Sequence, residues 1–244
     1  MNFVSKKYIS LLMTGAIACS ACSAYAAIAL DRTRAIFPGS EKLISLNIQN
    51  ESKKEPYLAQ AWLEDKNGVK LESPFSVTPP LQRVEPGAKS VVRINALPAV
   101  SSLPQDRESV FYFNLREIPP KSQRPNVLQV ALHSKIKLFY RPASIIPARF
   151  GRLDDKLVLH KVSGGYEVEN PTPYFMTVVG IMGDKNGTIS ADAKPVMISP
   201  MSKALVRSAS FSSPHVMTIN DFGGKPVMKY RCTGNECHSE PEEK

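Results

Sequence analysis

The sequence predicts an all-β protein with two β-sandwich domains, and three observations lead to this prediction. Apolar and polar residues alternate with a period of two in most segments, as in residues 44–48 and 111–115. Turn dipeptides such as Asn67-Gly68 and Gly223-Gly224 separate these short segments. The 20 prolines outnumber the 13 glycines, and no stretch keeps a helical apolar stripe for three turns. Many short strands at this spacing are typical of antiparallel sandwiches.

The first residues have the pattern of a secretory signal peptide. Lys6 and Lys7 form a basic start, residues 8–21 are largely apolar, and residues 24–26 match an A-x-A cleavage site. The apolar run is shorter than the roughly 20 residues of a membrane span. A lipoprotein signal is the alternative, but it requires a leucine-like residue three before a cysteine. We therefore expect residues 1–26 to be cleaved and the chain to be exported.

Composition and charge limit the class of protein further. Apolar residues make up 43% of the chain and charged residues 22%, which are ordinary values for a globular protein. Cleavage would lower the formal net charge of +9 by two, because it removes Lys6 and Lys7 and no acidic residue. Export makes nucleic acid an unexpected partner, so we expect none. The remaining positive charge fits a solvated surface or a few cations gathered for an anionic group on a partner.

A domain boundary is expected between residues 142 and 154. This segment (PASIIPARFGRLD) contains two prolines and a glycine and has no clear alternation, which suits a linker. The boundary gives an N-terminal domain of residues 27–145 and a C-terminal domain of residues 150–244. Each has about the 100 residues of one immunoglobulin-like sandwich.

Two cysteines, Cys232 and Cys237, remain after the predicted cleavage. In the oxidising compartment that an exported chain meets, this pair is expected to form one disulfide that closes a local hairpin. Two free thiols are one alternative. A metal site with His238 as third ligand is another, although no second ligand pair lies nearby in the sequence.

The segment from residue 127 to residue 140 is an unusually long alternating run. Its even positions begin with Leu128, Val130 and Leu132, and its odd positions include Lys137. As one strand it would span roughly 46 Å, whereas strands usually have 3–10 residues. It is either a long core strand with a bend or bulge, two strands run together, or an edge strand with an apolar row. Sheet edges of this kind are normally blunted, so the last alternative indicates strand addition to another chain.

Motifs of catalysis and of cofactor binding are not found in the sequence. The four histidines His133, His160, His215 and His238 do not form spaced ligand pairs, and no nucleophile elbow, phosphate-binding loop or dinucleotide-binding glycine motif is present. We therefore expect no enzyme activity, no cofactor, no metal and no small-molecule substrate. The single tryptophan, Trp62, is expected in the core.

Several long segments together resemble one family, the periplasmic pilus chaperones. They include AIALDRTRAIFPG (27–39), TPPLQRVEPGAKSVVRI (78–94), LPQDRESVFYFNLREIPP (103–120), KIKLFYRP (135–142) and INDFGGKPV (219–227). The likeness extends from about residue 27 to residue 237. It implies two immunoglobulin-like domains arranged as a boomerang with an interdomain cleft. It also implies a periplasmic chaperone that folds and caps pilus (fimbrial) subunits by donor-strand complementation.

The resemblance assigns roles to matching positions. Arg34 and Lys137 match the cleft cations that anchor the C-terminal carboxylate of a subunit, and the donated row is Leu128, Val130 and Leu132. Guanidinium and ammonium groups suit this task because their hydrogen bonds to a charged acceptor are strong. Without the resemblance, each cation would be taken for a solvated surface charge.

Further roles and partners also follow from the resemblance. Glu108, Arg141 and Asp221 are implied to form an ion network that holds the interdomain angle. The implied partners are pilus subunits (pilins and an adhesin), an outer-membrane usher, and a second copy of the chain in a self-capping homodimer when it is free.

Two other functions remain as alternatives. An exported adhesin or pilus component would have one domain with an open groove and an N-terminal donor extension, but little sequence precedes Leu30 for such an extension. A secreted hydrolase on a β-sandwich would need a nucleophile and a base, and the sequence shows no such arrangement.

Overall fold

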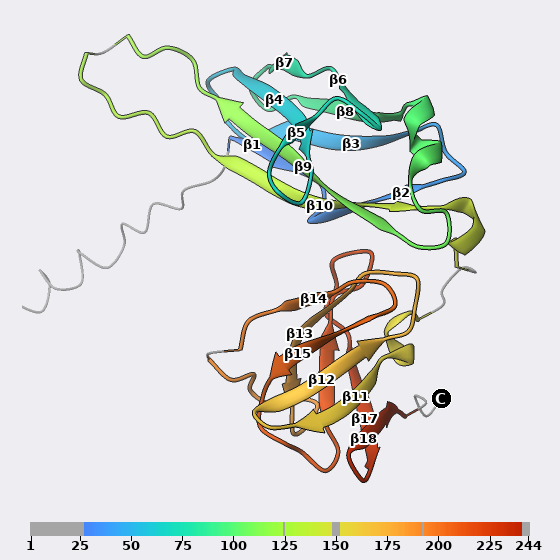
Figure 1. The fold of residues 1–244 in the computed structure, drawn as a ribbon. Helices are drawn as coiled ribbons and strands as arrows, with labels where there is room; N and C mark the ends of the chain where they lie inside the picture. The colour runs from blue at the N-terminus through green and yellow to red at the C-terminus, as the bar shows by residue number, and fades with distance from the viewer. Residues whose placement is uncertain (1–26, 124, 148–151, 192, 241–244) are drawn as a thin grey trace, which may run out of the picture.

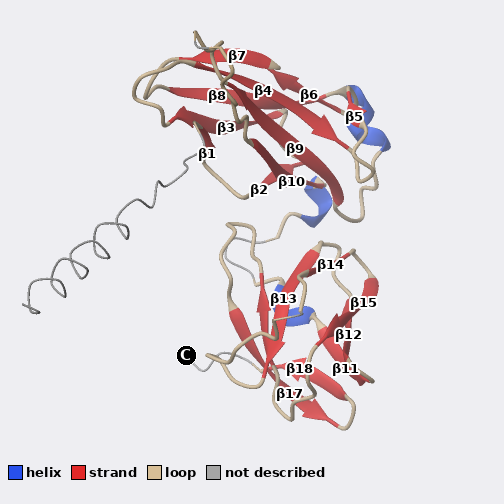
Figure 2. Cartoon of the chain, turned by 90° about the vertical axis from the view of Figure 1, so that its left-hand side faces the viewer, coloured by secondary structure: helices blue, strands red, loops and turns tan. Residues whose placement is uncertain are grey.

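The computed structural model describes residues 27–123, 125–147, 152–191 and 193–240. Two β-sandwich domains follow one another along the chain (Figure 1, Figure 2), which confirms the predicted fold class. The expected signal peptide lies outside the described residues. Within the described residues, no helix has both the length and the apolar character needed to cross a membrane.

The N-terminal domain packs two sheets face to face. The first sheet has the order β1 (Ile28–Leu30), β3 (Leu43–Asn50), β8 (Lys89–Ala96) and β6 (Phe75–Thr78). The second has the order β2 (Arg34–Pro38), β10 (His133–Arg141), β9 (Ser109–Ile118), β4 (Tyr57–Glu64) and β5 (Lys70–Leu71), with β7 (Leu81–Val84) also paired to β4. Two short 3-10 helices, η1 (Pro98–Ser102) and η2 (Ala143–Ile145), belong to the connections. Alternate residues point inward, so Phe37, Leu46, Phe113 and Leu138 are fully buried between the sheets.

The C-terminal domain is a continuous ladder of eight described strands. It begins after the 3-10 helix η3 (Asp154–Lys156). The strand order is β14 (Val196–Ile198), β13 (Met176–Met182), β16 (His215–Thr218), β17 (Val227–Thr233), β18 (Glu236–Ser239), β11 (Val158–Val162), β12 (Gly165–Asn170) and β15 (Ser202–Arg207). Its separate core contains Tyr166, Val178, Val216 and Tyr230.

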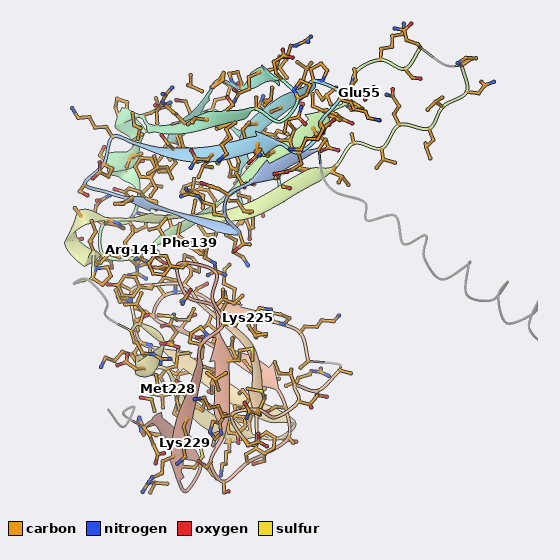
Figure 3. All side chains as sticks on the ribbon, turned by 180° about the vertical axis from the view of Figure 1, so that it is seen from behind. Glu55, Phe139, Arg141, Lys225, Met228 and Lys229 are labelled. Carbon is orange, nitrogen blue, oxygen red and sulfur yellow. A yellow bond between two sulfur atoms is a disulfide. The ribbon has the colours of Figure 1, made fainter. Side chains whose placement is uncertain are left out.

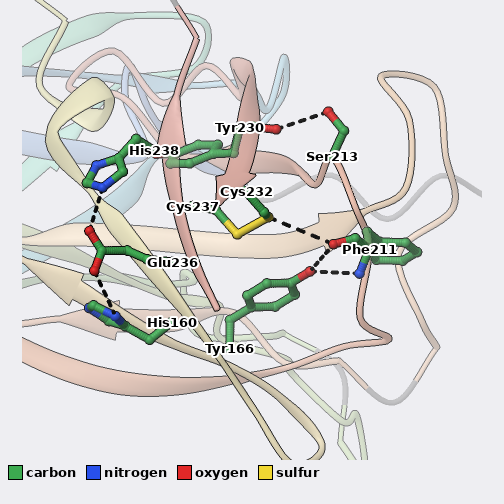
Figure 4. The surroundings of a disulfide bond; sticks show 9 residues. All are labelled: His160, Tyr166, Phe211, Ser213, Tyr230, Cys232, Glu236, Cys237 and His238. Atoms are coloured by element: carbon green, nitrogen blue, oxygen red, sulfur yellow. Dashed lines mark hydrogen bonds and ion pairs between the residues drawn. A yellow bond between two sulfur atoms is a disulfide. The ribbon is translucent and has the colours of Figure 1, made fainter. Parts of the chain in front are cut away.

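The Cys232–Cys237 disulfide is present and joins β17 to β18 (Figure 4). The two residues are paired opposite each other in the antiparallel ladder, with only the turn between them. The bridge therefore closes a local hairpin, as expected. Among the described residues, no group of histidine, cysteine and acidic side chains is arranged to hold a metal ion.

The long alternating segment is not one strand. Strand β10 begins at His133, and residues 127–132 have no regular secondary structure. The neighbouring strand β9 ends at Ile118, just before Pro119 and Pro120, whose nitrogens carry no hydrogen to donate to a ladder. Residues 119–123 and 125–132 therefore extend beyond the sandwich as parts of a long loop, which Figure 1 shows at one end of the N-terminal domain.

The expected core position of Trp62 is wrong. Ala61 and Leu63 point into the core from β4, so the intervening Trp62 lies half-buried on the outer face of the second sheet. There its ring stacks on His133, with centroids 5.1 Å apart, and its Nε1 donates to Glu64 at 2.7 Å. The register of β4, rather than the hydrophobicity of the side chain, determines which face of the sheet Trp62 occupies.

The two domains lie end to end at an angle, as the boomerang arrangement implies (Figure 1). Backbone contact between them includes the Glu108 amide, which donates to the Pro173 carbonyl at 2.9 Å. The Tyr174 hydroxyl also donates to the Ile145 carbonyl. Strand β10 ends at this junction, so its last residues face the C-terminal domain (Figure 3).

Candidate functional site

A pocket of about 340 Å³ lies at the junction of the two domains. The N-terminal domain contributes Arg34, Phe139 and Arg141 to its wall, and the C-terminal domain contributes residues that include Ile219 and Asp221. Figure 3 shows Phe139 and Arg141 at this boundary. The pocket therefore combines apolar surface with charged side chains of both signs from different parts of the chain.

Parallel pairing of β2 with β10 brings Arg34 beside Lys137. The two residues are register partners, although about 100 positions separate them in the sequence. Partners in neighbouring strands project from the same face of a sheet, so both cations point out of the sandwich on one side. The structure thus brings together the two cations that the sequence interpretation assigned to an anchor.

Arg34 has unsatisfied hydrogen-bonding capacity. Its Nη1 donates one long hydrogen bond to the Ile219 carbonyl at 3.4 Å, and its guanidinium lies 5.9 Å from the centre of the Phe139 ring. Its Nε is buried and has no hydrogen-bond partner among the described residues. Burial lowers the pKa of Arg34, and the negative charges of Asp221 and Glu108 only partly compensate. An unpaired buried donor of this kind favours an anionic ligand.

Lys137 is half-buried and forms no ion pair within the described ranges of the chain. Its pKa is lowered, first by burial and then by the positive charge of Arg34. Both effects disfavour the ammonium form. A carboxylate placed between Lys137 and Arg34 would reverse the second effect, because it would face two positive charges.

Glu108, Arg141 and Asp221 form the ion network that the sequence interpretation named. Arg141 Nε donates to Glu108 at 2.7 Å, and Arg141 Nη1 and Nη2 donate to the two oxygens of Asp221 at 2.7 and 3.0 Å. Glu108 and Arg141 belong to the N-terminal domain, whereas Asp221 follows β16 in the C-terminal domain. The network therefore connects the domains directly.

The rest of the network surrounds Glu108. Its second oxygen accepts a hydrogen bond from the Phe175 amide at 2.7 Å, and the Arg141 guanidinium lies 4.9 Å from the centre of the Tyr174 ring. Burial opposes the charge of Arg141, but Asp221 and Glu108 outweigh it and raise the pKa of Arg141. Burial also raises the pKa of Glu108, against the opposing influence of Arg141 and the Phe175 amide.

The apolar row is exposed. The exposed fraction is 89% for Leu128, 66% for Val130 and 41% for Leu132. The row is attached to the sandwich through Glu117, whose amide donates to the Leu132 carbonyl at 3.0 Å and whose side chain accepts from the Leu132 amide at 3.2 Å. These three side chains do not contribute to either described core.

An unpaired strand edge connects the row to the cations. Residues 133–136 of β10 pair with β9 on one side only, because the pairing of β10 with β2 begins at Lys137. The backbone groups on the other side of residues 133–136 have no partner strand among the described elements. Exposed edges of this kind accept an additional strand.

Sequence reasoning missed four residues of this region. Phe139 and Ile219 contact the Arg34 guanidinium, and Glu117 attaches the apolar row to the sandwich. Phe222 lines the pocket yet is 95% exposed. The turn signal Gly223-Gly224 marked its loop, but alternation alone could not show that the loop reaches the other domain. A Cβ atom on Gly223 would lie 2.4 Å from Oγ1 of Thr33, so this contact requires glycine.

Comparison with known proteins identifies the family. The family model described as "Pili and flagellar-assembly chaperone, PapD N-terminal domain" matches residues 27–146, and "Pili assembly chaperone PapD, C-terminal domain" matches residues 153–230. The chain belongs to the pilus assembly chaperone family. The resemblance found in the sequence is thereby confirmed.

Curated pilus chaperones are similar over most of their length. Chaperone protein PapD of Escherichia coli is 53% identical over 218 residues, which cover 89% of this chain and 91% of that protein. Chaperone protein PmfD of Proteus mirabilis is 41% identical, with 89% and 88% covered.

Solved pilus chaperones share the fold. The CupB2 chaperone of Pseudomonas aeruginosa has a TM-score of 0.70 and 34% identity, covering 84% of this chain and all of that one. The periplasmic chaperone SfaE has a TM-score of 0.67 and 31% identity, covering 83% and 98%. Membership in a chaperone family favours the chaperone hypothesis over a hydrolase, since the role of the family is not enzymatic. It also favours that hypothesis over a pilus component, since the two family models of a chaperone match both domains.

Proposed function

We propose that this pilus chaperone captures pilus subunits in the periplasm by lending them residues 127–132 as a strand. Arg34 and Lys137 would bind the C-terminal carboxylate of the subunit, and Leu128, Val130 and Leu132 would enter its open groove. Export is supported by the signal-peptide pattern of residues 1–26, and a periplasmic location by the similarity to periplasmic chaperone SfaE.

The unpaired edge of β10 is the single observation that supports this proposal most. It begins beside the exposed apolar row and ends at Lys137, which is paired in register with Arg34. A subunit strand that pairs with this edge would therefore place one segment beside the apolar row and its terminal carboxylate beside Arg34 and Lys137. Neither an enzyme nor an isolated adhesin domain needs this combination.

Binding of a carboxylate would satisfy groups that now lack partners. The free Nε of Arg34 and the ammonium of Lys137 can both donate to one carboxylate. Hydrogen bonds to charged groups contribute about 1.5–3 kcal/mol, more than the contribution of neutral pairs. Because the site is partly shielded from water by both domains, salt would screen this interaction less than it screens a surface ion pair.

The apolar row would supply the other part of the binding free energy. Burial of one such side chain contributes up to about 1.5–3 kcal/mol, and ordering of residues 127–132 opposes this gain. In the free protein the exposed row is a site for self-association, and we propose a transient self-capping homodimer.

We assign the network of Glu108, Arg141 and Asp221 to holding the interdomain angle. That angle fixes how Ile219 and Asp221 stand relative to Arg34, and hence the shape of the pocket. We propose further that the loaded chaperone delivers its subunit, pilin or adhesin, to an outer-membrane usher, and that it does so without a catalytic step.

The proposal is tested by co-expression with candidate pilins in the periplasm. The unaltered chain should yield a soluble one-to-one complex, whereas Arg34→Ala/Lys137→Ala should leave the pilin degraded. Circular dichroism of the purified variant controls for its folding. A matched control is Arg83→Ala/Lys89→Ala, which removes the same charges from exposed positions elsewhere in the N-terminal domain. Equal pilin recovery with a folded anchor variant would contradict the proposed anchor.

A further inference from the structure

The pocket at the domain junction extends beyond the two cations that the proposed carboxylate contact uses. Its volume is about 340 Å³, and Arg34 lines it whereas Lys137 does not. Most of its lining residues belong to the C-terminal domain. A carboxylate bound between the two cations would therefore lie at the edge of the pocket, and most of the volume would remain for another part of the ligand.

The charged side chains that line the pocket, apart from Arg34, pair with one another. Arg141 donates to both carboxylates of the ion network. Arg152 donates to the two oxygens of Asp154 at 3.1 and 3.0 Å. Among the lining residues, all of which the structure describes, Arg34 is the only charged one without an oppositely charged partner. The walls beyond Arg34 therefore offer no unpaired charge to a ligand.

The uncharged part of the lining is largely apolar. Phe139 and Phe175 pack against each other with ring centres 5.7 Å apart, and Figure 3 shows Phe139 where the two domains meet. Apolar residues of the C-terminal domain complete the lining, and they are Leu153, Met176, Ile219, Phe222 and Pro226. A charged group would lose hydration against this surface without gaining a partner, so the pocket favours an uncharged apolar group.

Phe222 differs from the other apolar lining residues because 95% of it is exposed. Its backbone is nevertheless held in place. The Phe222 amide donates to Oδ1 of Asn220 at 3.1 Å, and the preceding Asp221 is bound by the ion network. The following Gly223 lies against Thr33 of the N-terminal domain. A fixed turn thus presents an aromatic ring at the open side of the pocket, so little backbone ordering is needed when a ligand binds.

A peptide held by its terminal carboxylate would bring one side chain next to this pocket. The side chain and the carboxylate of its last residue branch from the same Cα atom, with a Cα–C bond of about 1.5 Å. The preceding Cα atom is about 3.8 Å further along the chain, and its side chain points to the opposite face of an extended strand. With the carboxylate at Arg34, the last residue is therefore the one whose side chain the pocket can accept.

We propose that the junction pocket is a subsite for the side chain of a subunit's last residue, and that Phe222 selects an apolar side chain there by covering its open side. This inference rests on the proposed carboxylate contact with Arg34 and Lys137. That contact is the same for every terminal residue, because it involves only the carboxylate. The subsite adds a preference among subunits, since a larger apolar side chain buries more surface against the Phe222 ring.

Isothermal titration calorimetry of the mature chain with synthetic free-acid peptides tests the subsite. The peptides copy the C-terminal strand of a co-expressed pilin and end in either leucine or alanine. The parent should bind the leucine peptide about 10-fold more tightly, because about three more carbon atoms are buried. In Phe222→Ala this ratio should fall to about threefold, because part of that burial is lost. The alanine peptide should bind both proteins alike, and Phe222→Tyr should keep the ratio of the parent.

The matched control is Leu205→Ala, which truncates another exposed apolar side chain of the C-terminal domain outside the pocket lining. It should leave the ratio unchanged. An unchanged ratio in Phe222→Ala, or an equal fall in Leu205→Ala, would overturn the subsite. The proposed anchor would survive that result if the parent still preferred free-acid to amidated peptides. Equal binding of free-acid and amidated peptides by the parent would contradict the anchor and the subsite together.

Discussion

Two guanidinium groups line the same pocket at the domain junction, yet their surroundings differ. Arg141 donates from Nε, Nη1 and Nη2 to carboxylates, and its side chain is only 6% exposed. Arg34 has one long hydrogen bond to a carbonyl and a buried Nε without a partner in the described chain. A buried cation whose donors are hydrogen-bonded stabilises the fold, whereas a buried cation with an unpartnered donor indicates a binding site for a ligand.

The largest expected loss of stability follows from substitution of Arg141, the cation whose hydrogen bonds connect the two domains. Arg141→Met leaves Glu108 buried without its positive partner, so the free energy of unfolding should fall by about 3–5 kcal/mol. Urea unfolding followed by tryptophan fluorescence and circular dichroism measures this loss. The double variant Glu108→Gln/Arg141→Met should recover most of it, because no buried charge then remains unpaired. A loss below about 1 kcal/mol in the single variant would show that Glu108 finds another partner.

Substitution of Arg34 is expected to have the opposite result, with little change in stability and a large change in ligand binding. Arg34→Met should change the free energy of unfolding by less than about 1 kcal/mol, because no ion pair is broken. Binding of a pilin C-terminal peptide should weaken by about 10- to 100-fold, the range for a hydrogen bond to a charged group. Isothermal titration calorimetry can compare free-acid and amidated peptides. The amidated peptide should bind both proteins alike, and a variant effect that persists with this peptide would contradict the carboxylate role.

A smaller effect is expected in the apolar row. Val130→Ser should leave the stability of the free chaperone unchanged because the side chain is 66% exposed. Its complex with a pilin should lose about 1–2 kcal/mol, which is the apolar burial that the side chain would no longer provide. The matched control is Gln129→Ser in the same loop, at the opposite parity. Similar losses for the two variants, measured as pilin dissociation rates, would argue against an inserted row.

The smallest effect concerns a third arginine of the pocket, Arg152, and its partner Asp154. Burial alone would raise the pKa of Asp154, but hydrogen bonds from Arg152 and Thr218 outweigh it and lower that pKa. A carboxyl group whose folded pKa is depressed stabilises the fold above its usual pKa of 3.8. This contribution is lost as the pH falls through the lower folded value.

The comparison for this prediction is Asp154→Asn. Urea midpoints measured between neutral and strongly acidic pH should decline less steeply at the acidic end in the variant than in the parent protein. Parallel pH profiles for the two proteins would show that Asp154 does not contribute to the acid sensitivity of the domain.

Local pattern predicted the fold well because period-two alternation directly reports which side chains face a sandwich core. It also located the apolar row, since Leu128, Val130 and Leu132 share one parity. It left the length of the strand open, because a strand needs a partner as well as alternation, and the partner strand β9 ends before Pro119 and Pro120. Trp62 was misplaced because hydrophobicity alone does not decide a face.

The candidate site was less accessible to sequence reasoning than the fold. Arg34 and Lys137 become neighbours only through parallel pairing of strands far apart in the chain, and no local signal encodes that pairing. The family resemblance supplied these residues and the network of Glu108, Arg141 and Asp221. Contacts made across the domain junction, such as those of Ile219, depend on how two folded units meet.

The fixed covalent spacing between the apolar row and Lys137 has a consequence for quality control. Lys137 follows Leu128 by nine positions, a span of at most about 30 Å. On the proposed mode of binding, a subunit with a truncated C-terminus could not reach both points in the correct register. A slip of one residue would turn its apolar side chains to the wrong face. The chaperone would then act as a molecular ruler that distinguishes completely synthesised subunits from incomplete ones.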